Sequence, residues 1–553
     1  MAARTSPEPL RAAAPAPPLD VVVVGAGIAG LTAAALLARE GLRVVLLEAQ
    51  QQTGGCAGTF RRGPWVFDVG ATQVAGLEPG GIHRRLFDHL GVAPPPATPL
   101  DPGCVVDLAD GRPPVRLHRD PAAWAAERQR QFPDSERFWA LCAAIHGASW
   151  AFAGRDPVLP PRSLWDLGQL LAALGPATLA SGLLTTATIA DLQSLCGCAG
   201  GASGARLRRF LDLQLRLYSQ EPADRTAALY GATVLQMAQE PLGLWHLEGS
   251  MQALSTALEQ ALATWGARLL RRHRLERLRP PARPGARWSL EGHSDGDPFQ
   301  LEARDVVLAI PPQALPELLG EALPGGYRRR LAGLDDPSGA LVFYGAVDRS
   351  ALPSQVPPHL QLDWDDPGSL FVSVSRDGDG RAPAGQATVI ASVFTPARPW
   401  FAGEAPEHRA RKLAAETGIR RGLERLLGVD PTCWRHGELA TPRAFARWTG
   451  RPFGFVGGLG QHPRRFGPFG LASRTPLDGL WLCGDSIHPG EGTAGVSLSA
   501  LMACRQLLQR RGRPWQWRDG AMAAARPAPG PASRPAAPAE AEAGAPSQPG
   551  PPS

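Results

Sequence analysis

The chain has 553 residues and a formal net charge of +6, with 44% hydrophobic and 20% charged residues. This length supports two or three domains around a sizeable core, and the composition excludes a chain that is disordered or fibrous throughout. Basic and acidic residues are interleaved, without a basic stripe or a nucleic-acid-binding motif, so we expect no nucleic-acid partner.

Both ends of the chain are rich in Pro and Ala. Residues 1–19, MAARTSPEPLRAAAPAPPL, lack the apolar segment of a secretory signal. Residues 512–553 contain too few apolar side chains to form a core. We therefore predict two disordered extensions and no signal peptide.

Residues 20–50, DVVVVGAGIAGLTAAALLAREGLRVVLLEAQ, have the pattern of a dinucleotide-binding β-α-β unit. The valines at 21–24 predict a strand buried on both faces of a parallel sheet, and apolar residues at helical spacing follow. A second buried strand is predicted at 44–47, with Glu48 at its end. These features favour a Rossmann-like α/β domain over an ordinary strand-to-helix turn, which a GxGxxG motif alone would not exclude.

Three glycines of this unit have separate predicted roles. Gly25 makes the tight turn, Gly27 lets a pyrophosphate approach the backbone, and Gly30 allows close packing of helix on strand. The N-terminus of the helix then faces the phosphates. Glu48 is placed to accept hydrogen bonds from an adenosine ribose.

A second glycine-rich segment, QQTGGCAGTFRRGPWVFDVGA, occupies residues 51–71. Here the chain resembles the flavin-containing amine oxidase superfamily, in particular its phytoene desaturase and carotenoid isomerase branch. The resemblance implies FAD as the cofactor and a double glycine, Gly54-Gly55, that continues the pyrophosphate contact; a surface turn is the alternative. Most members have Arg next, whereas this chain has Cys56-Ala57, so the contact of that Arg with phosphate is not expected here.

Two segments in the middle of the chain extend the resemblance. Residues 245–278 resemble the segment in which a glycine turn opens a helix and leads to a strand, and this implies an adenine contact near Leu275. An amphipathic helix packed on the sheet would give the same pattern. A buried strand predicted at 306–310 ends in Pro311-Pro312 and resembles the exit from the flavin domain.

The resemblance covers roughly residues 20–510 and implies an amine-oxidase-like fold of two discontinuous domains. The predicted FAD-binding domain comprises residues 20–95, 236–312 and 441–511. The predicted substrate domain, of sheet plus helices, comprises residues 96–235 and 313–440. Its second segment alternates as strands do and predicts a sheet over the flavin, whereas its first predicts helices that line a tunnel or contact a bilayer. A plain helical core is the alternative for these helices.

The sequence contains no Ser-His-Asp order, no metal-ligand spacing and no separated carboxylate pair that stands out. We therefore expect no metal site, and chemistry carried by the flavin. The eight cysteines lack CxxC spacing and are expected to be reduced thiols. Lys412, the only lysine, lies in a charged helical pattern typical of a solvated face. This disfavours amine oxidation, because the related amine oxidases use a lysine that holds a water at the flavin.

Residues 484–500, GDSIHPGEGTAGVSLSA, follow a predicted last buried strand, GLWLC. This block resembles the carotenoid isomerase and desaturase branch, and most of all the cyanobacterial C-3′,4′ carotenoid desaturases. The resemblance implies that Asp485 hydrogen-bonds the ribityl chain of the flavin. A helix opened by residues 492–495 would direct its positive end at the pyrimidine ring. The catalytic residues stay unknown, with His488 and Glu491 as candidates beside the flavin.

The predicted cofactor-binding residues therefore come from both ends of the chain. They are Gly25, Gly27, Ile28, Ala29, Gly30, Glu48, Ala49, Gly54, Gly55, Gly70, Ala71, Leu275, Gly484, Asp485, Gly492, Thr493, Ala494 and Val496.

Three functions fit these features. The first is an FAD-dependent carotenoid desaturase that acts at C-3′,4′ of an acyclic or monocyclic carotenoid in myxoxanthophyll-type biosynthesis, with a quinone or oxygen as electron acceptor. The second is a carotenoid cis-trans isomerase that uses reduced FAD. The third is a non-catalytic isoprenoid escort, because Rab GDP-dissociation inhibitors share this fold. The intact glycine motifs favour the first two.

Residues 170–190 carry no charge, but Gly175-Pro176 interrupts them and several hydroxyl residues dilute them. They predict an interfacial or cavity-lining segment rather than a transmembrane helix. We expect a peripheral protein on the cytoplasmic side of a thylakoid or plasma membrane.

Overall fold

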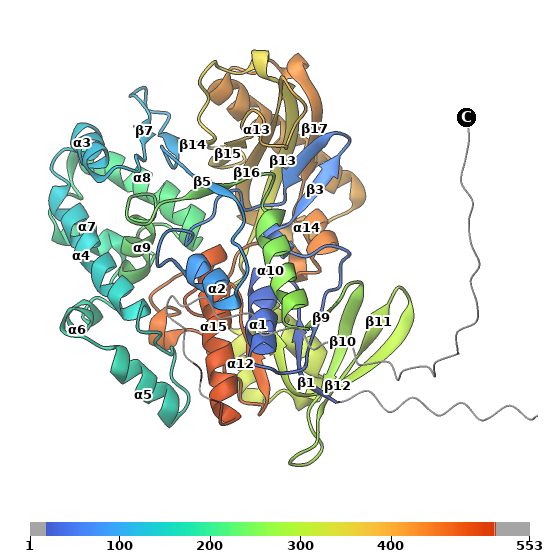
Figure 1. Cartoon of the computed structure of the whole chain (residues 1–553). Helices are drawn as coiled ribbons and strands as arrows, with labels where there is room; N and C mark the ends of the chain where they lie inside the picture. Colours follow the sequence, from blue (N-terminus) through green and yellow to red (C-terminus); the bar gives the residue numbers. More distant parts are fainter. Residues whose placement is uncertain (1–17, 514, 516–553) are drawn as a thin grey trace, which may run out of the picture.

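The computed structural model describes residues 18–513 and 515 (Figure 1). Most of the two predicted disordered extensions lies outside the described residues. Leu19, predicted as part of the first extension, already pairs with Ala303 as the start of a strand. Trp515, within the second, donates a hydrogen bond from Nε1 to Nε2 of His89 at 3.0 Å. The folded part of the chain therefore includes Leu19 and Trp515, which were predicted to lie in the two extensions.

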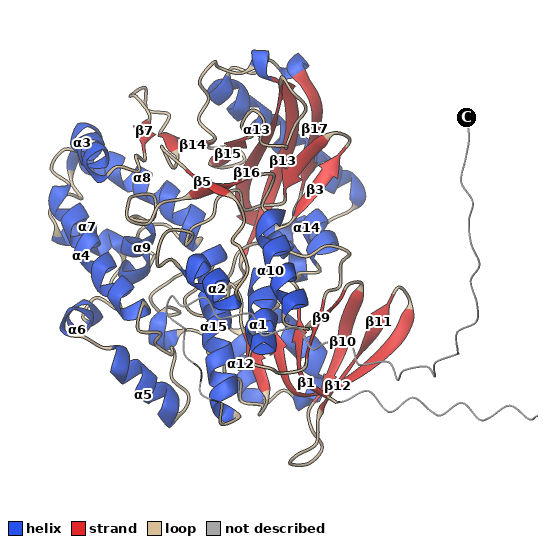
Figure 2. Ribbon diagram, in the orientation of Figure 1, coloured by secondary structure: helices blue, strands red, loops and turns tan. Residues whose placement is uncertain are grey.

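The first sheet contains the predicted β-α-β unit (Figure 2). Strand β1 runs parallel to β12 on one side and to β2 on the other, and β2 runs parallel to β9. Strand β18 joins β12 in parallel, while β10, β11 and β12 form an antiparallel extension. The strands are β10 (His273–Arg279), β11 (Trp288–Ser294), β12 (Asp297–Leu308), β1 (Leu19–Val24), β2 (Val44–Leu47), β9 (Arg268–Leu270) and β18 (Leu480–Leu482).

Strand β12 differs from the predicted strand at 306–310. It ends two residues earlier, at Leu308, because Ile310 precedes a proline and leaves the ladder. It begins much earlier, because its first half pairs with β11 outside the parallel part of the sheet.

The second sheet has the order β17-β13-β16-β15-β14-β6-β7, and only its β14–β6 pair is parallel. Its strands are β17 (Trp434–Ala440), β13 (Ser338–Asp348), β16 (Gln386–Pro396), β15 (Leu370–Val374), β14 (His359–Leu362), β6 (Val105–Asp107) and β7 (Val115–Arg116). Two hairpin-like pairs lie outside the two sheets: β3 (Thr59–Arg62) with β4 (Trp65–Asp68), and β5 (Ala97–Pro99) with β8 (Trp245–Leu247).

Helices α3, α4 and α7 to α9 gather on one side of the molecule (Figures 1 and 2). The described helices are α1 (Ile28–Arg39), α2 (Ile82–Leu90), α3 (Pro121–Gln131), α4 (Glu136–Ala153), α5 (Leu164–Ala173), α6 (Pro176–Gly182), α7 (Ile189–Leu195), α8 (Gly201–Ser219), α9 (Ala228–Val234), α10 (Gln252–Thr264), α11 (Leu315–Leu319), α12 (Gly325–Ala332), α13 (Ala405–Leu427), α14 (Pro442–Thr449) and α15 (Thr493–Arg510). In this part of the chain, none of them has the length and apolar character that crossing a bilayer requires.

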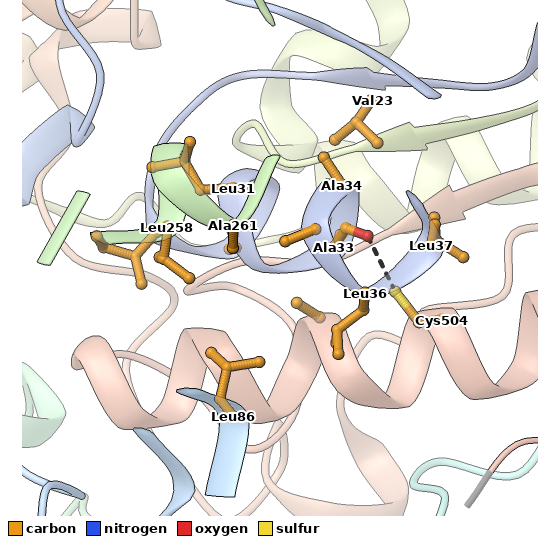
Figure 3. Close-up of a cluster of buried hydrophobic side chains, with 14 of the residues drawn as sticks. Val23, Leu31, Ala33, Ala34, Leu36, Leu37, Leu86, Leu258, Ala261 and Cys504 are labelled. Carbon is orange, nitrogen blue, oxygen red and sulfur yellow. Dashed lines mark hydrogen bonds between the residues drawn. The ribbon is translucent and has the colours of Figure 1, made fainter. Parts of the chain in front are cut away.

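The largest core lies where α1, α10 and α15 pack together beside the first sheet (Figure 3). Helix α1 is apolar all round and buries every residue from Ile28 to Ala38, so it is covered on all sides. The Cys504 thiol on α15 donates to the Ala33 carbonyl at 3.6 Å (Figure 3). This packing fixes the N-termini of α1 and α15 relative to each other.

The predicted α/β fold is confirmed. Strands from residues 20–95, 236–312 and 441–511 meet in the first sheet, and the second sheet uses strands from 96–235 and 313–440. The β5–β8 pair joins a strand of the predicted substrate domain to a strand of the predicted FAD-binding domain. The exact division into domains stays a prediction.

Candidate cofactor and substrate site

One large cavity, of about 2800 Å³, opens between the two sheets and the helices. Its wall includes the turns around Gly25 and Gly484, the face of β13 and parts of α5, α6, α8 and α9. All the predicted cofactor-binding residues except Gly30 line it. The structure therefore brings the turns at Gly25 and Gly484, more than 450 residues apart in sequence, to one space.

The turn before α1 leaves open space at the helix N-terminus. Gly25 has φ +94°, and a Cβ there would lie 2.9 Å from the Ala309 carbonyl oxygen. Gly27 precedes the helix, no side chain caps it, and a Cβ there would meet nothing within 4 Å. The N–H groups of Ile28 and Ala29 begin the helix beside this space, and such a terminus favours an anion.

Gly30 does not line the cavity, and its position matches the packing role predicted for it. A Cβ at this position would overlap the Gly25 carbonyl and lie 3.2 Å from Cβ of Ala309. The glycine thus lets α1 approach β1 and β12 closely.

Glu48 closes one end of the turn. Its Oε2 accepts from the Ala26 N–H at 2.7 Å and its Oε1 from the Gln50 N–H at 2.8 Å. Burial raises the pKa of this carboxyl, against the lowering effect of these hydrogen bonds and of Arg274. The backbone N–H groups of Ala26, Gln50 and Ala49 leave at least one of the four lone pairs of the carboxylate for a ligand hydroxyl.

The remaining residues predicted for the nucleotide end surround Glu48. The Gly54 N–H donates to the Ala26 carbonyl at 2.8 Å, which sets the double glycine beside the first turn. The His273 N–H donates to the Glu48 carbonyl at 2.8 Å and brings the start of β10, with Leu275, to the same wall. Ala49, Gly55, Gly70 and Ala71 also line the cavity.

The C-terminal turn repeats the arrangement at the start of α15. Gly484 has φ +121°, and a Cβ there would meet nothing within 4 Å. Ser499 holds this turn, since its Oγ accepts from the Gly484 N–H at 2.8 Å. Gly492, at φ +85°, precedes α15 without a side-chain cap. Thr493, Ala494 and Val496 of its first turn line the cavity.

Asp485 forms an ion pair that sequence reasoning missed. The Arg451 guanidinium donates to Oδ2 of Asp485 at 2.7 Å and to the Gly457 carbonyl at 2.7 Å. Arg451 lies close enough to Cys56 for the two groups to influence each other's pKa. The guanidinium reaches the region of Cys56 from a segment distant in sequence, which no local motif could reveal.

His488 and Glu491 differ in protonation although both line the cavity. Burial lowers the pKa of His488 to about 4, so its imidazole is neutral at neutral pH. Burial raises the pKa of Glu491 to about 8, so its carboxyl is mostly protonated there.

Several cavity residues come from segments without a recognisable motif. Tyr344 of β13 donates to the Val69 carbonyl at 2.6 Å, and Tyr230 of α9 donates to the Tyr218 carbonyl at 2.7 Å. These tyrosines line the cavity, although none belongs to the C-terminal motif. Gln220, at the end of α8, reaches Glu491.

Lys412, expected on a solvated face, is partly exposed but also lines the cavity. Its side chain, on α13, is half-buried and belongs to the cavity wall. Burial lowers the pKa of His408, one helical turn away, and the positive charges of Arg443, Lys412 and Arg411 lower it further. Helix α13 packs against β13, so the lysine lies in the part of the wall built by the second sheet.

The cavity fits a dinucleotide with a flavin. Open space lies over two uncapped helix N-termini, at Gly27 and at Gly492, and an acidic residue stands beside the first. Backbone N–H groups at a helix start suit a pyrophosphate, and an acid at the end of the second strand suits a ribose. The same kind of positive helix end suits the electron-rich edge of a flavin.

Comparisons with known proteins agree with this geometry. Residues 28–508 match the family of flavin containing amine oxidoreductases. The chain is 25% identical to a chloroplastic prolycopene isomerase of Arabidopsis thaliana, over 88% of this chain and 82% of that one. It is 28% identical to the hydroxyneurosporene desaturase of Cereibacter sphaeroides, over 88% and 97%.

A shorter match, 30% identical, covers 33% of this chain and 30% of the human all-trans-retinol 13,14-reductase. Among solved structures, a putrescine oxidase bound to putrescine superposes with a TM-score of 0.58 at 18% identity, over 90% of this chain and 99% of that one. An oxidoreductase from Methanosarcina mazei gives 0.56 at 16% identity, over 87% and 99%. These structural matches support the fold alone. The chain belongs to the family of flavin-containing amine oxidoreductases, and its cofactor is FAD.

Proposed function

We propose that this protein is an FAD-dependent carotenoid desaturase, acting at C-3′,4′ of an acyclic or monocyclic carotenoid in myxoxanthophyll-type biosynthesis. The observation that carries the proposal is that one continuous cavity extends from the two glycine turns into an apolar region. The likeness to a prolycopene isomerase and a hydroxyneurosporene desaturase supports a carotenoid as the substrate.

The far part of the cavity suits a long hydrocarbon. It is lined by apolar side chains from three helices (α5, α8 and α9), from the residues just after α5 and α9, and from β15, namely Leu170, Leu174, Leu213, Leu217, Leu229, Val234, Met237 and Phe371. Each buried methylene contributes about 0.8 kcal/mol, so such a lining supplies the binding energy that a polyene without polar groups needs. We assign this part of the cavity to the polyene.

FAD supplies the two-electron acceptor chemistry of the reaction when it is bound. The chain's own residues orient the polyene and exclude water, because a cation spread over a conjugated chain is short-lived in water. We propose a quinone or oxygen as the final electron acceptor.

The assignment of FAD-binding residues is part of the proposal. Gly27, Ile28 and Ala29 would hold the pyrophosphate, and Glu48 the ribose. Leu275 would lie at the adenine, and the start of α15 at the flavin ring. Asp485, already paired with Arg451, would reach the ribityl chain through the oxygen that this arginine leaves open.

A carotenoid cis-trans isomerase is the second candidate, and the full-length likeness to prolycopene isomerase favours it specifically. Product analysis separates the two. Incubation of the flavin-loaded protein with an acyclic carotenoid gives a product two mass units lighter if desaturation occurs. An isomerase gives an unchanged mass with a shifted retention time. If neither a desaturated nor an isomerised product forms from any acyclic or monocyclic carotenoid, the proposed substrate class is contradicted.

The position of Lys412 requires a test of amine oxidation as well. We expect no hydrogen peroxide from putrescine or from aromatic amines, and unchanged carotenoid turnover in Lys412→Met. Amine-dependent peroxide that disappears in this variant would assign the protein to amine oxidation instead. A purified protein that lacks a flavin spectrum would favour the non-catalytic escort.

We further propose that the protein docks on a membrane through α5 and α6. Leucines are exposed on these helices and directly after α6, with 89% of Leu164 and 87% of Leu183 accessible, and Leu179 is also exposed. Other residues of the same helices line the cavity, so the pair would connect a bilayer with the substrate space. The cytoplasmic side of a thylakoid or plasma membrane is the location that we propose.

Vesicle binding tests this surface. The unmodified protein should sediment with phospholipid vesicles, and a variant with serine at positions 164, 179 and 183 should stay in the supernatant. Leu413→Ser, at an exposed leucine of α13, is the matched control and should bind as the unmodified protein does. Equal binding by all three proteins would reject α5 and α6 as the docking surface.

A further inference from the structure

Glu491 is held in the cavity wall by donors that all reach one of its oxygens. Oε2 accepts from the Gly458 N–H at 3.1 Å and from the side-chain amide of Gln220. Within residues 18–513 and 515, no donor reaches Oε1. If the carboxyl carries a proton, Oε1 must hold it, because the lone pairs of Oε2 are already used.

The orientation of the Gln220 amide is fixed by two backbone groups. Its Oε1 accepts from the Ser338 N–H at 2.9 Å, and its Nε2 donates to the Val456 carbonyl at 3.0 Å. The second hydrogen of this nitrogen is therefore directed at Glu491. A flipped amide would place its nitrogen against the Ser338 N–H and its oxygen against the Val456 carbonyl and the Glu491 carboxyl, so the orientation is fixed. Gly457 makes room for this contact, since a Cβ there would collide with both side chains.

Several other ionisable groups surround Glu491. The Arg451–Asp485 ion pair lies close enough for both members to affect the carboxyl. The charge of Glu491 also raises the pKa of Cys56 and of Tyr230, after the larger effect of burial, so both groups stay protonated. The neutral His488 lies three residues away. Among these groups Glu491 alone combines an open oxygen, a place in the cavity wall and a proton it can exchange near neutral pH.

We propose that Glu491 is the group that receives the proton released by the substrate, and that Gln220 is its positioning residue. This inference rests on the proposed desaturase function. Two C–H bonds on neighbouring carbons of the substrate break: FAD, when bound, would supply the acceptor for one hydrogen with its electron pair, and the electrons of the other C–H bond form the new double bond. Its proton passes to the ionised carboxyl of Glu491, and from there to solvent.

The protonation of Glu491 sets the sign of the pH dependence. Burial raises its pKa to about 8, although Gln220, Gly458 and Arg451 lower it. The carboxyl is thus ionised only in a minority of molecules at pH 7 and in most of them at pH 9. A reaction that uses the ionised form accelerates as the pH rises through about 8 and then levels off.

Infrared spectroscopy of the flavin-loaded protein without substrate tests the titration itself. The unmodified protein should show a protonated-carboxyl band that disappears with a midpoint near pH 8, and Glu491→Gln should lack this band. Glu321→Gln is the matched control, because its side chain is fully exposed. A band unchanged in Glu491→Gln, or a midpoint below pH 5, would overturn the proposal whether or not any carotenoid is a substrate.

Turnover of the carotenoid then tests the role. We expect the desaturation rate to rise through pH 8 in the unmodified protein, and to fall about 100-fold with a flat profile in Glu491→Gln. A profile that falls through pH 8, or a rate equal to that of Glu321→Gln, would overturn the assignment of Glu491 as the base. No turnover by the unmodified protein, with the infrared titration intact, would reject the proposed function instead.

Gln220 needs a measurement that a merely structural role would not change. In Gln220→Leu the ionised carboxyl loses a donor, so the midpoint of the infrared band should move to higher pH. Gln220→Asn, which keeps the amide on a shorter side chain, should show a smaller displacement. An unchanged midpoint in Gln220→Leu, with the protein folded and flavin bound, would remove Gln220 from the proposal.

Discussion

The N-termini of α1 and α15 use the same backbone device for different purposes. Each begins after a glycine without a side-chain cap, and each faces the same cavity. The wall at α1 consists mainly of backbone and small side chains, with Glu48 at its edge. The wall at α15 contains a cluster of ionisable side chains, Arg451, Asp485 and Glu491. Backbone groups suffice to hold a phosphate, whereas a reacting centre needs side chains that can hold or move charge.

The glycines at the α1 end should separate packing from binding. Gly30→Ala places a methyl group against the Gly25 carbonyl, so we expect a loss of about 3 kcal/mol in the free energy of unfolding. Gly27→Val adds its side chain in open space and should keep the unmodified stability, while FAD affinity falls at least about tenfold. Thermal unfolding with and without FAD measures both effects. A stable Gly30→Ala variant would contradict the packing role.

The ion pair at the α15 end should matter for stability. Arg451→Met leaves the largely buried carboxylate of Asp485 without its partner, so we expect the free energy of unfolding to fall by about 3 kcal/mol. Adding Asp485→Asn to this variant should restore part of the lost stability. Arg398→Met is the control, because its pair with Asp336 is exposed and contributes less than about 1 kcal/mol. Denaturant unfolding of the unmodified protein and these three variants gives the comparison. Equal losses at positions 451 and 398 would contradict a larger contribution of the Arg451–Asp485 pair to stability.

Glu48 should have a moderate effect that is confined to the nucleotide end. Glu48→Gln replaces one acceptor of a backbone N–H by a donor, and we expect a loss of about 1 to 2 kcal/mol in stability and weaker FAD binding. Titration with FAD, followed by flavin fluorescence, measures the affinity. The infrared band of Glu491 should stay unchanged in this variant, and a displaced band would mean that the two ends are coupled.

His488 should give the smallest effect. Burial holds its pKa at about 4, so it carries no charge between pH 6 and pH 9. His488→Gln should therefore keep the shape of the pH–rate profile, whatever its effect on the rate. Loss of the step near pH 8 in this variant would transfer the proton-accepting role from Glu491 to His488.

The α1 end could be predicted almost completely from the sequence, because its contacts are local. The strand predicted at 44–47 is confirmed to the residue, and the predicted helix begins at Ile28, directly after Gly27. Local periodicity and glycine spacing determine both. The helix at Thr493 was predicted for the same reason, since glycines mark its start.

The side chains at the α15 end could not be found in this way. Gln220 and Glu491 are 271 residues apart in sequence, and Arg451 follows a glycine turn after α14 that carries no motif. The half-buried position of Lys412 was also missed, because a charged helix pattern does not reveal which sheet will cover it. Long-range packing decides these positions.

A crystal structure of the protein with FAD bound would test the central claim most directly. We expect the pyrophosphate at the N-H groups of residues 27–29 and the isoalloxazine ring at the start of α15, within reach of Glu491. A flavin ring located elsewhere, with residues 492–496 in contact with protein or solvent only, would contradict the claim that the two glycine turns are the two ends of one cofactor site.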